Sequence, residues 1–229
     1  MKGYVRTPVT GSDLVKGVGV WYYCGMPSKH IQKTYVEDSY YHIYNRGVEK
    51  RVIFIDNEDY TVFLSMLKRH LSKKHQWDKQ GREYPNYHEG ITLLAFCLMP
   101  NHFHLLVYQK EDRFVITKLM RSVCTAYTMY FNRKYKRVGH LFQERFKASL
   151  IQEDVYLQHI SRYIHLNPDN YQQWQYSSLQ YYLGEKSSSW LDPNPILSLF
   201  KGENYLRFME DYRDHRQMLK DLKSQLADN

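Results

Sequence analysis

The chain has 229 residues, of which 43% are hydrophobic and 24% charged, so it can bury a core within one domain plus additions. No apolar segment approaches the roughly 20 residues needed to span a bilayer, and the N-terminal residues lack the apolar segment of a secretory signal, which predicts a cytoplasmic protein without membrane contact. The formal net charge of +8 favours an anionic partner and, for nucleic acid, association with the nucleoid.

The first strand and the first helix are expected between residues 36 and 75. Residues 1–35 lack sustained periodicity and are interpreted as an N-terminal extension that is either flexible or peripheral to the domain. The β-prone run Tyr40–Asn45 ends at Asn45-Arg46-Gly47, a turn signal that predicts a strand. Asp56 or Asn57 is then expected to cap a helix. Its buried face is predicted from apolar residues at helical spacing, namely Tyr60, Phe63, Leu64, Leu67 and Leu71.

Two apolar runs in the middle of the chain predict a pair of buried strands. Residues 91–98 form the first run and residues 102–107 the second, with Pro100-Asn101 as a tight turn between them. Side chains two residues apart on a strand share a face, so His102 and His104 project together while Phe103 points to the opposite layer. Because imidazole is the commonest metal ligand, the two histidines predict part of a metal site or an acid–base pair.

The remaining periodic segments are two helices and one strand. A second helix is expected over about 114–136, a loop at 139–143, and a short fourth strand over 146–152. Glu153 and Asp154 begin a third helix, which Pro168 ends because proline cannot continue the hydrogen-bond ladder. The resulting order β-α-β-β-α-β-α predicts an α+β fold of the ferredoxin-like split βαβ type, with a four-stranded antiparallel sheet and helices on one face.

The chain beyond about residue 171 is interpreted as a C-terminal appendage. It holds an aromatic patch at Trp174 and Tyr176, a break at Asp192-Pro193-Asn194-Pro195, and an amphipathic pattern that predicts a helix over about 205–226. The predicted organisation is therefore an extension at 1–35, a central domain at 36–182 and a helical tail at 183–229.

The third helix carries polar side chains beside its buried stripe. His159, Tyr163 and Asn167 are spaced by four and form one row, so a phenol and an amide oxygen can be brought to the two histidines of the central strand. A phenol with a pKa near 10 is a poor nucleophile, and a divalent cation can help it attack phosphorus by neutralising the phosphate. Tyr127 and Tyr130 are the alternative nucleophiles, although their spacing fits core packing better.

Basic residues cluster after the second helix. The segment 130–150 holds six cations against Glu144, and the chain has 22 tyrosines and four tryptophans. Aromatic rings stack on unpaired bases while cations pair with phosphates, so this combination favours a single-stranded nucleic acid. The predicted nucleic-acid contacts are Lys68, Arg69, Arg133, Lys134, Lys136, Arg137, Arg145 and Lys147.

Four blocks in this order resemble a known family. They are Tyr41-His42-Ile43-Tyr44-Asn45-Arg46-Gly47, Met99-Pro100-Asn101-His102-Phe103-His104-Leu105-Leu106, Gly139-His140-Leu141-Phe142-Gln143-Glu144-Arg145-Phe146-Lys147 and Arg162-Tyr163-Ile164-His165-Leu166-Asn167-Pro168. Over roughly 40–182 the chain resembles the REP-associated tyrosine transposases, which are relatives of the single-tyrosine HUH transposases of small insertion sequences.

The resemblance implies roles for individual residues. His102 and His104 would be metal ligands, Asn167 the third ligand, and Tyr163 the nucleophile that forms a 5′-phosphotyrosyl link and frees a 3′-hydroxyl. The implied cofactor is Mg²⁺ or Mn²⁺, and the implied substrates are short imperfect palindromes folded as single-stranded DNA hairpins. Relatives act as monomers or as dimers, and the sequence does not decide between a monomer and a homodimer. His159 and His165 are candidates for proton transfer to the leaving oxygen.

Two other functions remain open at the level of the sequence. The first is a catalytically silent protein that binds structured single-stranded nucleic acid with its basic and aromatic surface. The second is a metallohydrolase that uses His102 and His104 with a water nucleophile; its activity would survive Tyr163→Phe and would leave no covalent adduct. The leading hypothesis is a metal-dependent single-stranded DNA endonuclease and strand transferase.

Overall fold

One antiparallel sheet organises the part of the chain that the computed structural model describes, namely residues 35–200, 202 and 204–211. Its strands are β1 (Ser39–Arg46), β2 (Ile91–Met99), β3 (His102–Gln109) and β4 (Lys147–Ile151), in the spatial order β2-β3-β1-β4. All three strand pairs are antiparallel. This order is that of the ferredoxin-like fold, so the predicted fold class is confirmed.

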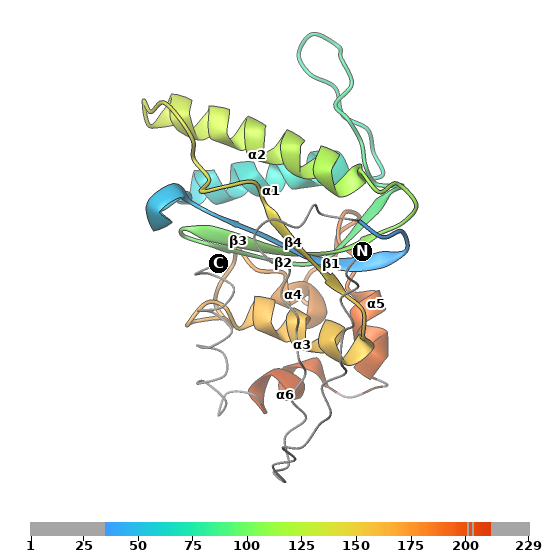
Figure 1. Cartoon of the computed structure of the whole chain (residues 1–229). Coiled ribbons are helices and arrows are strands. Elements are labelled where there is room, and N and C mark those ends of the chain that lie inside the picture. The colour runs from blue at the N-terminus through green and yellow to red at the C-terminus, as the bar shows by residue number, and fades with distance from the viewer. Residues whose placement is uncertain (1–34, 201, 203, 212–229) are drawn as a thin grey trace, which may run out of the picture.

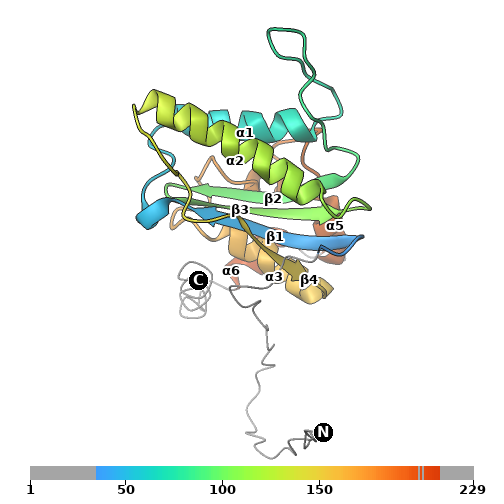
Figure 2. The ribbon, with the colours of Figure 1, turned by 45° about the horizontal axis from the view of Figure 1, so that its top comes forward.

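Helices cover both faces of this sheet (Figures 1 and 2). One face carries α1 (Asn57–Leu71) and α2 (Val115–Lys134), the two helices of the split βαβ unit. The other face carries α3 (Asp154–His165), α4 (Leu179–Tyr182), α5 (Asn194–Leu197) and α6 (Tyr205–Glu210). The prediction placed helices on one face only. It needs correction for α3, because β4 leads directly into a helix that returns beneath the sheet.

The sheet separates two hydrophobic cores because successive strand residues point to opposite faces. On β3, Phe103, Leu105 and Val107 belong to the core beneath α1 and α2, whereas Leu106 belongs to the core around α3. On β2 the register against β3 shifts between Leu93 and Ala95. A bulge of this kind changes which alternate residues face each core.

The buried carboxylate of Asp59 links α1 to the C-terminal end of α2. Asp56 and Asp59 form a capping box at the start of α1. Asp59 also accepts hydrogen bonds from Tyr135 and Lys134 of the neighbouring α2 end. Burial raises the pKa of Asp59, but the hydrogen bonds from Ile55, Lys134 and Tyr135 outweigh it, so the pKa is lowered. Lys134 therefore stabilises the helix layer, and we no longer expect it to contact a phosphate.

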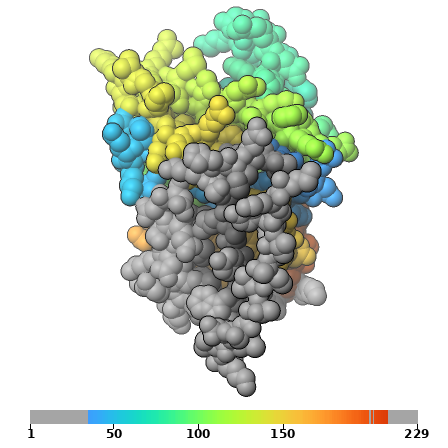
Figure 3. All heavy atoms as spheres, viewed as in Figure 1, coloured from blue at the N-terminus to red at the C-terminus, as the bar shows by residue number. Residues whose placement is uncertain are grey.

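Two segments extend this layered core. The loop at 72–90 projects beyond α1 as a separate lobe (Figure 3). In the C-terminal region, α5, the 3-10 helix η2 (Ser198–Phe200) and α6 join the core around α3 through Ile196, Phe200, Tyr205 and Met209. Of the helix predicted at 205–226, the structure shows α6 up to Glu210 with Asp211 as its C-cap. Residues 212–226 of that prediction lie outside the described residues, as do residues 1–34 of the extension predicted at 1–35.

Replacing Phe103 tests how much the core beneath α1 and α2 contributes to stability. This ring is fully buried and contacts Phe63 and Phe142, so Phe103→Ala should lower the free energy of unfolding by about 3–5 kcal/mol through lost contacts and a cavity. Urea denaturation would measure the loss. Phe114 is 68% exposed, so the matched change Phe114→Ala should stay within about 0.5 kcal/mol. Equal losses in both variants would contradict this description.

Candidate active site

Backbone hydrogen bonds from the segment after β1 hold the turn between β2 and β3, and they fix the position at which β3 begins. Pro100 O accepts from the backbone N–H groups of Ile53 and Phe54, at 2.7 and 3.0 Å, and Asn101 O accepts from Gly47 N–H at 2.8 Å. A side chain at Gly47 would collide with the carbonyl oxygen of Arg51. The glycine of the Asn45-Arg46-Gly47 turn thus permits the close approach that anchors the hairpin.

His102 and His104 project from β3 toward α3 and meet the side chain of Asn167. Asn167 Oδ1 lies 3.3 Å from His102 Nε2, and Asn167 Nδ2 lies 3.3 Å from His104 Nε2. Asn167 comes two residues after the end of α3 and directly before Pro168. The structure therefore brings together the three side chains that the sequence analysis selected as metal ligands.

Tyr163 lies in the same cluster, in the last turn of α3 and four residues before Asn167. Its ring packs edge-on against His104, with 5.4 Å between centroids, and its hydroxyl forms a hydrogen bond with Asn167. The side chain is 4% exposed. Burial raises the pKa of Tyr163, and the hydrogen bond with Asn167 offsets only part of the shift. The phenol is therefore protonated near neutral pH and needs activation to act as a nucleophile.

The protonation pattern of His102 suits a cation. Asn101 Nδ2 donates to Lys50 O, which turns Asn101 Oδ1 toward His102 Nδ1 at 2.6 Å. Both ring nitrogens of His102 face amide oxygens, but a neutral imidazole has only one N–H, and the shorter contact, 2.6 Å against 3.3 Å, assigns it to Nδ1. His102 Nε2 then presents a lone pair to another acceptor, Asn167 Oδ1. A divalent cation bound by both atoms would satisfy both lone pairs, and neighbouring ligands of a cation with bonds of about 2.1 Å lie about 3 Å apart.

Two further features bear on cation binding. Among the residues that the structure describes, no group of three His, Cys, Asp or Glu side chains could hold a metal ion. A site at His102 and His104 would therefore depend on the amide oxygen of Asn167. The C-terminal end of α3 lies at this cluster, and the partial negative charge of a helix C-terminus favours a cation there.

Sequence reasoning missed two residues around the histidines. His42 on β1 is 1% exposed, and its Nε2 lies 2.9 Å from His104 Nδ1. Burial lowers the pKa of His42 to about 3, so the ring is neutral. The second missed residue is Asn101, which orients His102. The available signal for His42 was its position in the first motif and on the same strand face as Tyr40 and Tyr44.

The two histidines predicted to assist proton transfer lie elsewhere. His165 is fully buried, with Nδ1 2.7 Å from Tyr205 Oη and Nε2 2.7 Å from Ser178 Oγ. It links α3 to α6 and to the segment before α4. His159 Nδ1 lies 2.6 Å from an Arg162 guanidinium nitrogen. The structure therefore does not bring either ring to the cluster of His102, His104, Tyr163 and Asn167, and proton transfer by them stays an untested prediction that the geometry does not favour.

Tyr127 and Tyr130, the alternative nucleophiles, form hydrogen bonds within the layer of α1 and α2. Tyr127 donates to Ile53 O at 2.5 Å, and Tyr130 donates to Asp59 at 2.9 Å. Both belong to α2, on the opposite side of the sheet from His104. Their location excludes them from chemistry at the histidine cluster.

The predicted phosphate contacts do not form a single patch. Lys68 and Arg69 stand at the C-terminal end of α1, whereas Arg133, Lys136 and Arg137 stand at the C-terminal end of α2. The contact between Lys134 and Asp59 at the start of α1 shows that these helices run antiparallel, so the two groups lie at opposite ends of the layer.

Lys147 is the predicted cation that the sheet register places beside the histidine cluster. Lys147 on β4 pairs with Tyr44 on β1, and Tyr44 pairs with His104 on β3. The Lys147 ammonium lies 6.0 Å from the centroid of the Tyr44 ring. A cation and an aromatic ring thus flank the candidate ligands in one row across the sheet. Arg145 is exposed in the approach to β4.

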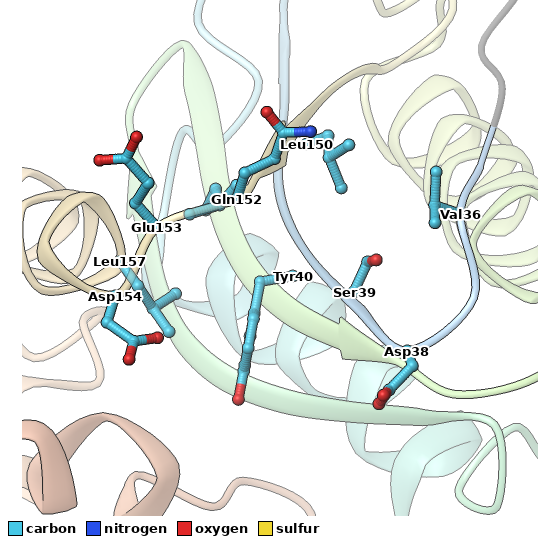
Figure 4. A pocket seen from close by; sticks show the side chains of 10 residues that line it. Val36, Asp38, Ser39, Tyr40, Leu150, Gln152, Glu153, Asp154 and Leu157 are labelled. Atoms are coloured by element: carbon cyan, nitrogen blue, oxygen red, sulfur yellow. The ribbon is translucent and has the colours of Figure 1, made fainter. Parts of the chain in front are cut away.

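A pocket of about 320 Å³ lies at the other end of α3 (Figure 4). It is formed where β1 begins, β4 ends and α3 begins. Its lining includes the acidic residues Asp38, Glu153 and Asp154. Because carboxylates repel phosphate, this end of α3 is unsuited to DNA.

The chain matches the family model described as "Transposase IS200 like" over residues 35–167. This span exceeds half of the 229 residues and includes His102, His104, Tyr163 and Asn167. The chain belongs to the IS200-like transposase family. The resemblance to tyrosine transposases noted from the sequence is thereby confirmed at the level of the family. No curated protein matches the chain.

One solved structure resembles this member of the IS200-like transposase family in fold, and a second matches it more weakly. A REP-associated tyrosine transposase bound to a REP hairpin is 13% identical, with 71% of this chain and 90% of that chain covered and a TM-score of 0.51. A putative transposase from Deinococcus radiodurans is 15% identical, with 69% and 98% covered and a TM-score of 0.36. In the described part of this transposase-family chain, no helix is both long and apolar enough to span a membrane.

His165 should matter for stability. Replacement by alanine removes a buried ring and leaves the hydroxyls of Tyr205 and Ser178 without this partner. We expect His165→Ala to lower the free energy of unfolding by about 2–4 kcal/mol, measured by urea denaturation. The exposed His140 supplies the control, since His140→Ala should change stability by less than about 0.5 kcal/mol. An unchanged stability in His165→Ala would refute the structural role.

Proposed function

We propose that this protein is a metal-dependent endonuclease and strand transferase for single-stranded DNA, with Tyr163 as its nucleophile. The observation that carries the proposal is the convergence of Tyr163, His102, His104 and Asn167 from two distant segments into one cluster. Membership of the IS200-like transposase family supports a DNA-processing reaction. The first structural relative described above was solved with a REP hairpin, which supports hairpins of this kind as substrates.

The proposed reaction is a transesterification at phosphorus. The Tyr163 oxygen forms a bond to the scissile phosphorus and the bond from phosphorus to the 3′-oxygen breaks. The phenol loses its proton, and the 3′-oxygen gains one to become a hydroxyl. The product is a 5′-phosphotyrosyl link that conserves the energy of the ester, so the free end can be joined to another strand by the reverse attack.

Mg²⁺ or Mn²⁺ is the proposed cofactor, held by His102, His104 and Asn167. When bound, such a cation supplies charge that neutralises and polarises the scissile phosphate. The chain's own contribution is to present the ligand atoms from β3 and from the end of α3. The hydrogen bond between Asn167 and the Tyr163 hydroxyl also aligns the phenol with the proposed cation site.

DNA binding in this proposal uses the side of the sheet that carries the histidines. Lys147 and Tyr44 flank His104 in the same cross-strand row, where a phosphate and a base beside the cut could be held. The mass of the native DNA complex, measured by light scattering, distinguishes a monomer from a homodimer bound to the hairpin.

Tyr163→Phe is the decisive variant. Labelled single-stranded hairpins from repeats flanking the gene, incubated with Mn²⁺ or Mg²⁺, should give a DNA-linked protein band on a denaturing gel with the wild type. Tyr163→Phe should abolish this band because it removes the attacking oxygen. Tyr156→Phe makes the same change two turns earlier on α3 and should retain the band.

Other outcomes of this gel assign the other functions. Cleavage without an adduct in both the wild type and Tyr163→Phe would favour a hydrolase with a water nucleophile. Binding of the hairpin without cleavage under every metal condition would favour a catalytically silent binding protein. Either result would overturn the proposed transesterification.

Lys147 should contribute to hairpin affinity through phosphate. We expect Lys147→Met to weaken binding and to reduce the slope of log K against log salt by about 0.7, the value for one contact to single-stranded DNA. Fluorescence anisotropy between about 50 and 200 mM salt would measure the slope. Lys118 is an exposed cation on α2 that forms an ion pair with Asp112, and Lys118→Met should leave the slope unchanged. Equal slopes for wild type and Lys147→Met would count against the contact.

A further inference from the structure

A third histidine stands behind the candidate ligands on the neighbouring strand. His42 lies in the middle of β1, and its side chain points to the same side of the sheet as His104. The two imidazole rings stack at 5.1 Å between centroids with an interplanar angle of 21°. The His42 ring also meets the edge of Tyr163 at 6.0 Å. His42 thus contacts both a proposed ligand and the proposed nucleophile.

The hydrogen bond between the two rings constrains the proton on His104. His104 Nδ1 faces His42 Nε2 at 2.9 Å, and His104 Nε2 faces Asn167 Nδ2 at 3.3 Å. With the Asn167 amide oriented so that Oδ1 faces His102, its nitrogen faces His104 and can only donate, so His104 Nε2 accepts and carries a lone pair. The single proton of a neutral His104 is then on Nδ1, where it is donated to His42 Nε2. His42 in turn carries its own proton on Nδ1.

This arrangement is the one that a metal ligand requires. A ligating imidazole binds through a nitrogen lone pair and commonly donates its other N–H to a fixed acceptor, which sets the tautomer and the ring orientation. His42 offers such an acceptor without a charge of its own. A buried polar ring is costly unless it is hydrogen-bonded, so the bond to His104 also accounts for a histidine at this core position.

We propose that His42 is a positioning residue that holds His104 as the Nδ1–H tautomer and directs its Nε2 lone pair to the cation site. The proposal rests on the proposed metal site at His102, His104 and Asn167. It assigns to His42 no contact with the ion or with DNA. The contact with Tyr163 gives His42 a second effect, because the same ring limits the positions that the nucleophile can take.

The test compares two replacements that differ in their acceptor. His42→Phe keeps a planar ring of similar size but has no hydrogen-bond acceptor, whereas His42→Gln retains an acceptor oxygen. We expect His42→Phe to weaken Mn²⁺ binding about 10–100-fold and His42→Gln to weaken it less. Mn²⁺ binding to the full chain without DNA is followed by loss of the free-ion signal in electron paramagnetic resonance.

A matched control addresses the effect of removing a buried histidine. His70 is buried on α1, in the core on the other side of the sheet, and bonds to Pro85 O. His70→Phe should leave the Mn²⁺ affinity unchanged. Equal Mn²⁺ affinities in wild type and His42→Phe would overturn the role of His42. An equal loss in His42→Phe and His42→Gln would show that ring shape, and not the acceptor, matters, and would also overturn it.

A second measurement keeps the inference testable if His42→Phe fails to fold. Nitrogen-15 chemical shifts of the wild-type imidazoles distinguish the protonated from the unprotonated ring nitrogen. We expect His104 to show a protonated Nδ1 and an unprotonated Nε2 in the metal-free protein. A protonated Nε2 would overturn the proposal. Failure of the wild type to bind Mn²⁺ would instead overturn the metal site itself, while the tautomer of His104 would still report on His42.

Discussion

The alternation of side chains on the paired strands β1 and β3 is the constraint on which the site depends. Each strand sends every second residue into the core beneath α1 and α2 and the others toward α3. This alternation buries Phe103 in the core beneath α1 and α2 and directs His102 and His104 toward α3. The antiparallel register then sets Tyr44 opposite His104 and Lys147 opposite Tyr44. A shift of one residue would exchange the two faces and remove the whole row from α3.

The second constraint is the position at which α3 ends. The helix begins beside the acidic residues at the far end of β1 and ends beneath the histidines, where Pro168 stops it. Asn167 therefore reaches His102 and His104 from a point just beyond α3, and Tyr163 reaches His104 from the last turn of α3. The bonds of His165 to Tyr205 and Ser178 hold this end of α3 against α6 and the segment before α4. His165 thus supports the cluster by fixing the helix that carries Tyr163.

The sequence predicts most of this arrangement because much of it follows from periodicity. A period of two placed His102 and His104 on one strand face, and a spacing of four placed Tyr163 near Asn167. Periodicity shows that α3 has a buried stripe but does not show which face of the sheet it covers, because both faces are apolar. The separation of Lys68 from Arg133 depends on the antiparallel packing of two helices. The partnership of His42 with His104 depends on strand pairing across 62 positions. Both are tertiary properties.

The proposed donor set has a consequence for the chemistry. Two neutral imidazoles and a neutral amide add no negative charge, whereas carboxylate ligands would neutralise part of the charge of the cation. A divalent cation held by His102, His104 and Asn167 would keep its full charge for the phosphate, which is the group that it has to polarise. The acidic residues near α3 gather instead at its opposite end, where they stabilise the helix N-terminus. The carboxylates at the start of α3 thus disfavour a phosphate there, whereas a phosphate at the Tyr163 end would be held by the cation and by Lys147.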